Sequence, residues 1–338
     1  MKAGDNVKLL QVENLKTTFH IDAGHVQAVR GISFHVEKGE SIGIVGESGS
    51  GKSVSMLSLL KLLPDNATLT ADNILFDGAQ MVNTSQKAMR KMLGRDIGMI
   101  FQDPMTSLNP LFTVGEQIIE PLRIHQKLSK EAARQRAIEI LRMVEIPSPE
   151  KRLKQYPHEF SGGMRQRVMI AIALSCSPKL LIADEPTTAL DVTIQAQILD
   201  LMRDLKDKLN VSIVMITHDL GVIANMCNRI IVMYGGTIVE QGTTREIFYK
   251  PRHPYTWGLL RSIPQFTEGE KKKLISIPGS PPDLLRPPAG CAFTARCPYA
   301  MKVCEKRPPQ SVSLSETHQA ACWLMHPKAA NHMREVIG

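Results

Sequence analysis

The stretch that decides the fold is Gly46-Glu47-Ser48-Gly49-Ser50-Gly51-Lys52-Ser53. It matches the phosphate-loop pattern G-x-x-x-x-G-K-S/T in full, and it lies between a strand-like apolar run at 41–45 and a helix-like stretch at 54–63. Strand, glycine loop and helix are the context that this motif requires. Backbone N–H groups of the loop and the helix N-terminus can face phosphates, while Lys52 reaches the terminal phosphates and Ser53 offers a hydroxyl to Mg²⁺. The stretch therefore predicts a binding site for a nucleoside triphosphate.

The composition is that of an ordinary globular protein. Hydrophobic residues make up 43% and charged residues 22% of the 338 residues, a length that allows two units with cores of their own. The formal net charge is +8, but the basic residues are scattered and aromatic residues are only 5%, so we expect no nucleic-acid partner. No apolar stretch approaches the roughly 18 residues that span a bilayer, and the first residues lack an apolar signal core. We expect a chain that is cytosolic by itself, with a positive balance that suits docking beside an anionic membrane leaflet.

The pattern along the chain indicates two domains. Strand-like runs alternate with helical patterns as far as about residue 245, which predicts an α/β domain with a mainly parallel sheet. Within it, the segment from about 94 to 175 is mostly helical, so we expect a helical subdomain inserted into the α/β core. Beyond Gly242 prolines crowd together, and proline at this density excludes regular sheet and long helices. The predicted domains are residues 1–250 and a small C-terminal extension at 251–338.

Two acidic residues follow an apolar, strand-like run. The run Lys179-Leu180-Leu181-Ile182-Ala183 leads directly into Asp184 and Glu185. Acids placed after a buried strand beside a phosphate site can organise Mg²⁺ and act as a general base, and we assign the first role to Asp184 and the second to Glu185. The alternative is that the pair merely solvates the end of the strand. A further apolar run at 211–217 ends in His218, at the sheet edge where α/β proteins bind ligands.

A second glycine-containing turn comes about twenty residues before the acidic pair and opens a helix. It reads Phe160-Ser161-Gly162-Gly163-Met164-Arg165-Gln166-Arg167. Ser161 with two glycines at a helix N-terminus makes another phosphate cradle. One chain does not obviously need two such cradles. We therefore expect ATP to be held between the Lys52 loop of one subunit and residues 161–163 of a partner.

In this order the motifs resemble those of the nucleotide-binding subunit of an ABC transporter, over roughly residues 8 to 248. The resemblance implies a P-loop ABC ATPase fold with an N-terminal antiparallel β region. It also implies a role for each of four residues. Gln102 would be the Q-loop glutamine that contacts Mg²⁺ and the attacking water, and Asp191 would be the D-loop aspartate. His218 would be the switch histidine, and Phe19 the aromatic residue that stacks on adenine. Ser53, Gln102 and Asp184 would then hold Mg²⁺. One position departs from the pattern, because Met164 stands where the family signature usually has glutamine.

Further segments at 102–110, 252–256 and 290–298 resemble the ABC subfamily that energises dipeptide and oligopeptide importers. Nickel and glutathione importers share this subfamily. Membership implies two transmembrane permease subunits, a second ATPase subunit that is homologous but not identical, and an extracytoplasmic solute-binding protein. It also implies a peripheral position at the cytoplasmic face of the inner membrane.

Two other function classes are less well supported. A soluble ABC ATPase acting on ribosomes or in DNA repair generally has two fused cassettes or a long coiled-coil insertion, and this chain has one cassette and no heptads. A non-catalytic subunit would have lost Glu185 or His218, and both are present. We therefore expect an ATP-hydrolysing subunit that powers the import of peptides.

Four cysteines lie in the C-terminal extension: Cys291, Cys297, Cys304 and Cys322. Stable disulfides are disfavoured in a cytosolic chain, and zinc sites usually have closer cysteine pairs than the five, six and seventeen residues that separate these. A [4Fe–4S] cluster, a zinc site and unligated thiols all stay open on chemistry alone. The subfamily resemblance favours the [4Fe–4S] cluster. Cys176 and Cys227 are expected to be small buried hydrophobic residues.

Overall fold

The computed structural model describes residues 7–188, 190–263 and 276–329. The chain divides into two compact units whose segments interleave along the sequence. The first unit comprises Met1–Leu9, Val36–Ser41 and Asn83–Ile216, and the second comprises Leu10–His35, Ile42–Val82 and Thr217–Gly338. The division of the chain at residue 250 stays a prediction.

The first unit contains parallel strands, namely β7 (Ile97–Ile100), β8 (Leu180–Asp184) and β9 (Ser212–Thr217). β8 lies between the other two and pairs with both. Every residue of β8 and β9 is buried, which is why both strands read as continuous apolar runs. After β8, α8 (Val192–Leu209) buries one face at helical spacing, through Ile198, Leu201, Met202 and Leu205. These strands confirm the predicted mainly parallel sheet.

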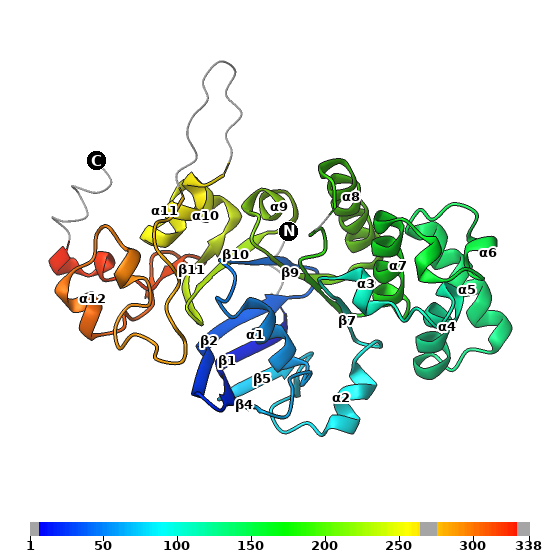
Figure 1. Cartoon of the computed structure of the whole chain (residues 1–338), viewed down its shortest axis with the longest axis horizontal. Helices are drawn as coiled ribbons and strands as arrows, with labels where there is room; N and C mark the ends of the chain where they lie inside the picture. The colour runs from blue at the N-terminus through cyan, green and yellow to red at the C-terminus, as the bar shows by residue number, and fades with distance from the viewer. Residues whose placement is uncertain (1–6, 189, 264–275, 330–338) are drawn as a thin grey trace, which may run out of the picture. The chain divides into compact units, whose positions relative to one another are not determined.

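Helices separate β7 from β8 and confirm the predicted helical insertion (Figure 1). They are α3 (Pro104–Ser107), α4 (Val114–His125), α5 (Lys130–Met143), α6 (Pro149–Arg152), a 3-10 turn at Pro157–Glu159, and α7 (Gly162–Leu174), and α2 (Gln86–Met92) precedes β7. Side-chain oxygens of Thr113, Ser129 and Ser161 cap α4, α5 and α7 by accepting backbone N–H groups. Among the helices that the structure describes, none is long and apolar enough to cross a bilayer.

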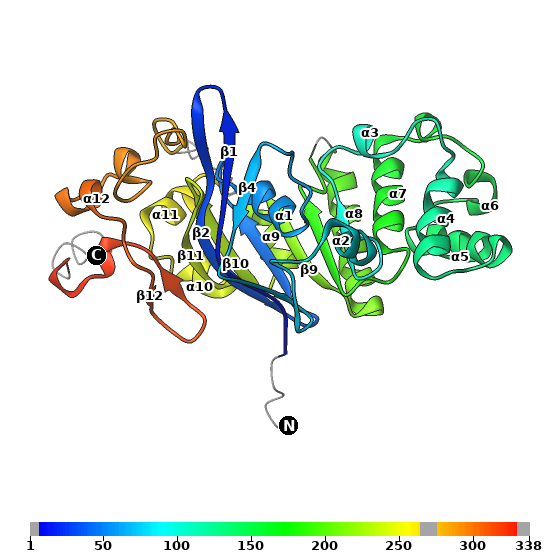
Figure 2. The ribbon, with the colours of Figure 1, turned by 90° about the horizontal axis from the view of Figure 1, so that it is seen from below.

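An antiparallel sheet occupies much of the second unit. Its strand order is β2 (Gly24–Glu37), β1 (Lys8–Ile21), β5 (Asn73–Phe76) and β6 (Ala79–Gln80), and β4 (Ala67–Thr70) also pairs with β1. β1 and β2 form the long hairpin seen in Figure 2. Leu10, Val12 and Leu15 of β1 are buried. This sheet confirms the predicted N-terminal antiparallel region.

The phosphate-loop motif lies between β3 (Ser41–Val45) and α1 (Lys52–Leu59), which confirms the predicted strand, loop and helix. β3 pairs in parallel with β10 (Arg229–Tyr234), and β10 pairs antiparallel with β11 (Thr237–Thr243). α9 (Leu220–Met226) packs so closely on β3 that a Cβ on Gly43 would lie 2.4 Å from Cδ1 of Ile223. α10 (Thr244–Tyr249) follows β11.

The C-terminal segment is more regular than its proline content predicts. It carries α11 (Pro254–Arg261), α12 (Lys302–Lys306), 3-10 turns at Thr294–Arg296, Trp323–Met325 and Pro327–Ala329, and the short strands β12 (Val312–Ser313) and β13 (Gln319–Ala320). β13 pairs with β11, with Ala320 opposite Glu240. The expectation that proline excludes sheet from this segment is wrong, because no proline lies between residues 310 and 326 and the edge of β11 offers backbone N–H and C=O groups to a further strand.

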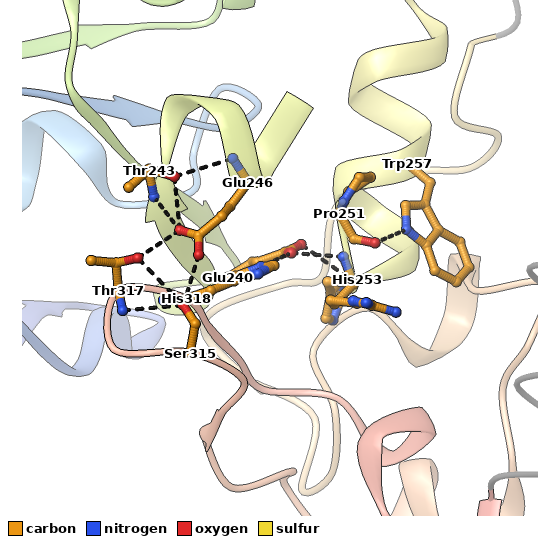
Figure 3. Close-up of polar contacts among 10 residues, drawn as sticks. Glu240, Thr243, Glu246, Pro251, His253, Trp257, Ser315, Thr317 and His318 are labelled. Carbon is orange, nitrogen blue, oxygen red and sulfur yellow. Dashed lines mark hydrogen bonds and ion pairs between the residues drawn. The ribbon is translucent and has the colours of Figure 1, made fainter. Parts of the chain in front are cut away.

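Polar side chains fasten the C-terminal segment to β11 and α10 (Figure 3). Glu240 is buried on β11, where its carboxylate lies 2.8 Å from His318 Nε2 and accepts the backbone N–H of His253 at 2.9 Å. The hydroxyls of Ser315 and Thr317 donate to the Glu246 carboxylate at 2.7 and 2.8 Å. The segment is therefore held in place by hydrogen bonds as well as by strand pairing.

Candidate functional site

The phosphate loop is shaped by glycines at two crowded positions. Gly46 and Gly51 have φ angles of +154° and +96°, where residues with a side chain are strained. A Cβ on Gly46 would lie 2.2 Å from the carbonyl oxygen of Met233, and a Cβ on Gly51 would lie 2.5 Å from that of Ala28. Substitution at either position would push the loop off the backbone segments on which it rests.

Lys52 is folded onto this loop. It is the first residue of α1, it is 5% exposed, and its Nζ donates to the carbonyl oxygens of Gly46 at 2.7 Å and Glu47 at 2.9 Å. Ser53 follows on the same helix and is half-buried, while Ser48 and Gly49 are exposed at the tip of the loop. An ammonium group among loop carbonyls at a helix N-terminus is a preformed positive site for phosphate oxygens.

Glu47, within the same loop, forms hydrogen bonds with two residues that are not among the predicted site residues. Its carboxylate pairs with the guanidinium of Arg296 at 2.5 and 2.9 Å, and its backbone N–H donates to the hydroxyl of Tyr255 at 2.8 Å. Both partners stand in the C-terminal segments at 252–256 and 290–298. Nothing in the local pattern pairs Arg296 with a loop 249 residues away.

The acidic pair lies at the carboxyl end of β8, in the first unit. Asp184 is 6% exposed and is the last residue of the strand. Glu185 has a φ of +47°, and an off-pattern backbone at a strand end is a frequent feature of functional sites. Its Oε2 accepts hydrogen bonds from Gln102 Nε2 at 2.9 Å and from the hydroxyl of Thr188 at 2.8 Å. The predicted base and the predicted Q-loop glutamine are thus in direct contact.

The second glycine turn opens α7, also in the first unit. Ser161 caps the helix, with its hydroxyl 3.4 Å from the N–H of Met164, and Ser161 and Gly162 are exposed. A Cβ on Gly163 would lie 2.8 Å from Ile194, so α7 and α8 approach closely here. Because the cap uses only the backbone of Met164, the departure from glutamine leaves this turn intact. Asp191 caps α8 by accepting the N–H of Ile194 at 2.9 Å.

His218 and Phe19 belong to the second unit. His218 is exposed and directly follows the last residue of β9. The next residue, Asp219, caps α9 and donates its N–H to the hydroxyl of Thr217 at 3.0 Å, which anchors the backbone beside His218. Phe19 is half-buried on β1, opposite Ala67 of β4.

The structure therefore brings together Gln102 with Glu185 in the first unit, and Gly46 with Glu47, Ser50 and Lys52 in the second. The roles predicted for all these residues, and for the signature turn, Asp191, His218 and Phe19, stay predictions.

The four cysteines of the C-terminal segment influence one another. Cys291 donates its backbone N–H to the carbonyl oxygen of Cys304 at 2.7 Å. Burial raises the pKa of the Cys297 thiol to about 11 and that of Cys322 to about 12, and the other thiols of the group add repulsion. Among the described residues, however, no group of three or more His, Cys, Asp or Glu side chains is arranged to hold a metal ion. The structure gives the iron–sulfur prediction no direct support.

The remaining cysteines behave as expected. Cys176 and Cys227 are 7% and 8% exposed, respectively, and burial raises the pKa of the Cys176 thiol. Both are buried small residues.

Comparison with known proteins gives two family matches. Residues 29–188 match the family described as ABC transporter, and residues 239–304 match the family described as oligopeptide/dipeptide transporter, C-terminal region. Over 70% of this chain, the ATP-binding cassette MJ0796, solved as a dimer in a post-hydrolysis state with ADP and Pi, superposes with a TM-score of 0.63 at 29% identity, and 99% of that cassette is covered.

Curated relatives are similar over almost their whole length. The oligopeptide transport ATP-binding protein OppD of Bacillus subtilis is 57% identical over 95% of this chain and 90% of the relative. The dipeptide transport ATP-binding protein DppD of the same organism is 53% identical over 95% and 96%, and DppD of Escherichia coli is 49% identical over 93% and 96%. The chain therefore belongs to the family of ABC transporter ATP-binding subunits, in the branch with the oligopeptide/dipeptide transporter C-terminal region.

Proposed function

We propose that the chain is the ATP-hydrolysing subunit that powers a membrane importer of dipeptides or oligopeptides. The observation that carries the proposal is the similarity, along nearly the whole chain, to relatives named for dipeptide and oligopeptide transport. The match extends through the C-terminal segment, which a generic ATP-binding cassette does not require. The preformed positive loop around Lys52 supports the ATP-binding part of the proposal.

ATP binding uses the loop at 46–53. The phosphates take the place of the carbonyl oxygens of Gly46 and Glu47 around the Lys52 ammonium group, and backbone N–H groups of the loop supply further donors. Phe19 stacks on the adenine. Hydroxyl, amide and carboxylate oxygens are the donors that Mg²⁺ prefers, so Ser53, Gln102 and Asp184 fit the ion chemically. Bound Mg²⁺ would neutralise charge on the phosphate oxygens.

Hydrolysis depends on Glu185 as the general base. Its carboxylate takes a proton from the attacking water, and the hydrogen bonds from Gln102 and Thr188 orient the oxygen that does so. The hydrogen bond of Gln102 to Glu185 links this base to the loop that contains Gln102. His218 stabilises negative charge that develops on the γ-phosphate, and Asp191 shapes the facing edge of the site.

Each complete site includes Ser161, Gly162 and Gly163 of a second ATPase subunit. The exposure of Ser161 and Gly162 at the start of α7 supports this arrangement, because the N-terminus of a helix of this length can face phosphate from outside the chain. The structurally similar cassette was solved as a dimer. The second ATPase subunit is a homologous, non-identical chain.

Two permease subunits dock against the helical part of the first unit. Exposed apolar side chains gather on and before α4, where Leu111 is 80% and Ile124 is 63% exposed. A groove of about 1080 Å³ runs along α4 and the loops on either side of it, and its lining includes Phe112, Glu120, Arg123, Ile124 and Lys127. A groove that combines apolar and charged side chains suits an amphipathic helix of a membrane subunit. The chain is then peripheral, at the cytoplasmic face of the membrane, and an extracytoplasmic solute-binding protein delivers the peptide.

The four cysteines hold one [4Fe–4S] cluster in this proposal. Buried thiols with raised pKa values stay protonated unless a metal supplies positive charge, which suits a site that is completed by its metal. Protein purified without oxygen should contain iron and acid-labile sulfide in equal amounts, and Cys304→Ser should remove both while ATP still binds. Zinc in place of iron, or four thiols that alkylate freely in the native protein, would rule the cluster out.

The test of the transported solute uses the complex purified with its own partner subunits. In vesicles supplied with ATP, di- and oligopeptides should stimulate ATP hydrolysis. They should accumulate on the side of the membrane that carries the ATPase subunits. Nickel and glutathione, the cargoes of the alternative importers in this subfamily, should do neither. Stimulation by nickel or glutathione with no response to peptides would refute peptide import while leaving the ATPase assignment in place.

A further inference from the structure

The C-terminal segment contacts the phosphate loop through the guanidinium group of Arg296 as well as through the hydroxyl of Tyr255. Arg296, in the 3-10 turn Thr294–Arg296, pairs with both carboxylate oxygens of Glu47. The side chain of Arg296 is 5% exposed and that of Glu47 is 27% exposed, so the pair is largely shielded from water. Paired, parallel hydrogen bonds from an arginine to a carboxylate are strong and directional.

Every donor of Arg296 has an acceptor. Besides the contacts with Glu47, Nε donates to the carbonyl oxygen of Pro278 at 2.8 Å, Nη2 to that of Ile277 at 3.1 Å, and Nη1 to the hydroxyl of Tyr234 at 3.1 Å. The hydrogen bonds to Glu47 raise the pKa of the guanidinium, although burial opposes this. A side chain fixed in this way holds one orientation, which is the property required of a group that orients another.

Aromatic rings form the support for Arg296. Tyr234 lies 4.5 Å from Tyr255 and 5.1 Å from Phe293 between ring centroids, and the Arg296 guanidinium carbon is 5.7 Å from the centre of the Tyr234 ring. These rings are buried. Tyr234 is at the end of β10, Tyr255 is in α11, and Phe293 directly precedes the 3-10 turn that contains Arg296. The support is therefore part of the packed core of the second unit.

The Glu47 backbone is held independently of its side chain. Its N–H donates to Tyr255, and its carbonyl oxygen accepts from Lys52 Nζ and from the N–H of Ser50 at 3.2 Å. Loss of the carboxylate would leave these bonds in place. The distinct contribution of Arg296 is thus to hold and neutralise a negative charge inside a loop that has to accept negatively charged phosphates.

We propose that Arg296 is a positioning residue of the ATP-binding loop, through which the C-terminal segment sets the affinity for ATP by holding and neutralising the Glu47 carboxylate. The inference rests on the proposed role of the loop at 46–53 in ATP binding. Without Arg296, the Glu47 carboxylate would be a free negative charge beside the phosphates, and ATP binding would weaken by repulsion.

The test measures ATP affinity, with Mg²⁺, for the full chain by titration calorimetry. Arg296→Met should raise the Kd about tenfold, a change that corresponds to about 1.4 kcal/mol. The double variant Glu47→Gln with Arg296→Met should return to within roughly threefold of the unchanged protein, because the charge that Arg296 neutralises is then gone. Arg296→Lys, which keeps the charge but not the paired geometry, should lie between. Arg307→Met, an exposed arginine of the same segment, is the matched control and should leave the Kd unchanged.

Further readouts separate charge neutralisation from a merely structural role. The deficit of Arg296→Met should shrink as salt is added, because salt screens the repulsion, and in the assembled transporter it should appear in KM rather than in kcat. Glu47→Gln alone should bind ATP at least as tightly as the unchanged protein. This measurement tests the inference even if the Arg296 variants fail to fold.

The outcomes are distinct. Normal ATP affinity in Arg296→Met, or a double variant as weak as the single one, would overturn the inference, and so would a tenfold loss in Glu47→Gln alone. If Lys52→Ala also bound ATP normally, the assignment of the loop itself would fail, and with it the proposed function.

Discussion

Acidification should destabilise the second unit through one buried histidine. His253 is 1% exposed and caps α11 by accepting the N–H of Tyr255 at 3.1 Å. Burial lowers its pKa from 6.5 to about 4, against the opposing attraction of the Glu240 carboxylate. Between these values the unfolded chain binds more protons than the folded one, so the stability that neutral His253 contributes is complete above pH 6.5 and is lost as the pH falls toward 4. The gap corresponds to about 3 kcal/mol of unfolding free energy.

Urea unfolding of the protein and of His253→Asn isolates this effect. Asparagine can also cap a helix but does not titrate, so the variant should lack this part of the pH dependence. Between about pH 7 and about pH 4.5, the unchanged protein should lose about 2 kcal/mol more unfolding free energy than the variant. In an NMR titration, the His253 ring should change its protonation near pH 4. Equal pH dependence in the two proteins, or a His253 ring that titrates near 6.5, would refute the reasoning.

Further outcomes test the ATP site and the attachment of the C-terminal segment. Glu185→Gln should keep its ATP affinity but lower turnover of the assembled transporter by roughly 100-fold or more, because an amide cannot take the proton from water; near-normal turnover would remove Glu185 from catalysis. The isolated chain should show weak ATPase activity that rises steeply when it assembles with the second ATPase subunit, and full activity per chain where light scattering finds only monomer would exclude the shared site. Burial raises the pKa of Glu246, but hydrogen bonds from Ser315, Thr243 and Thr317 outweigh it and lower the pKa to about 2. Glu246→Gln should therefore speed amide hydrogen exchange at 311–320, whereas the exposed control Glu316→Gln should not.

The parts of the site that depend on local chain chemistry could be predicted from the sequence. A phosphate loop requires glycines at positions where a Cβ would collide with neighbouring backbone, and the structure has such collisions at Gly46 and Gly51. Buried parallel strands require nearly uninterrupted apolar runs, and such runs in the sequence predict β8 and β9. Helix caps at Thr113, Ser129 and Ser161 follow the same local rule.

The C-terminal segment shows where local reasoning fails. Proline density predicted a segment without sheet, yet β13 adds to β11 because the open edge of that strand has hydrogen-bonding groups to satisfy. The cysteines of this segment predicted ligands for a metal, whereas the side chain of Arg296, between Cys291 and Cys297, is the one that forms an ion pair with Glu47 of the phosphate loop.

The family, the α/β architecture with its helical insertion, and the strand, loop and helix around residues 46–53 could be predicted from the sequence, because each depends on residue types at short, fixed spacings. Which distant side chains meet depends on the packed fold. The contact of Gln102 with Glu185 spans 83 residues, and that of Glu47 with Arg296 spans 249. Such pairs form because packing of strands and aromatic rings brings separate segments together, and no spacing along the chain encodes that meeting.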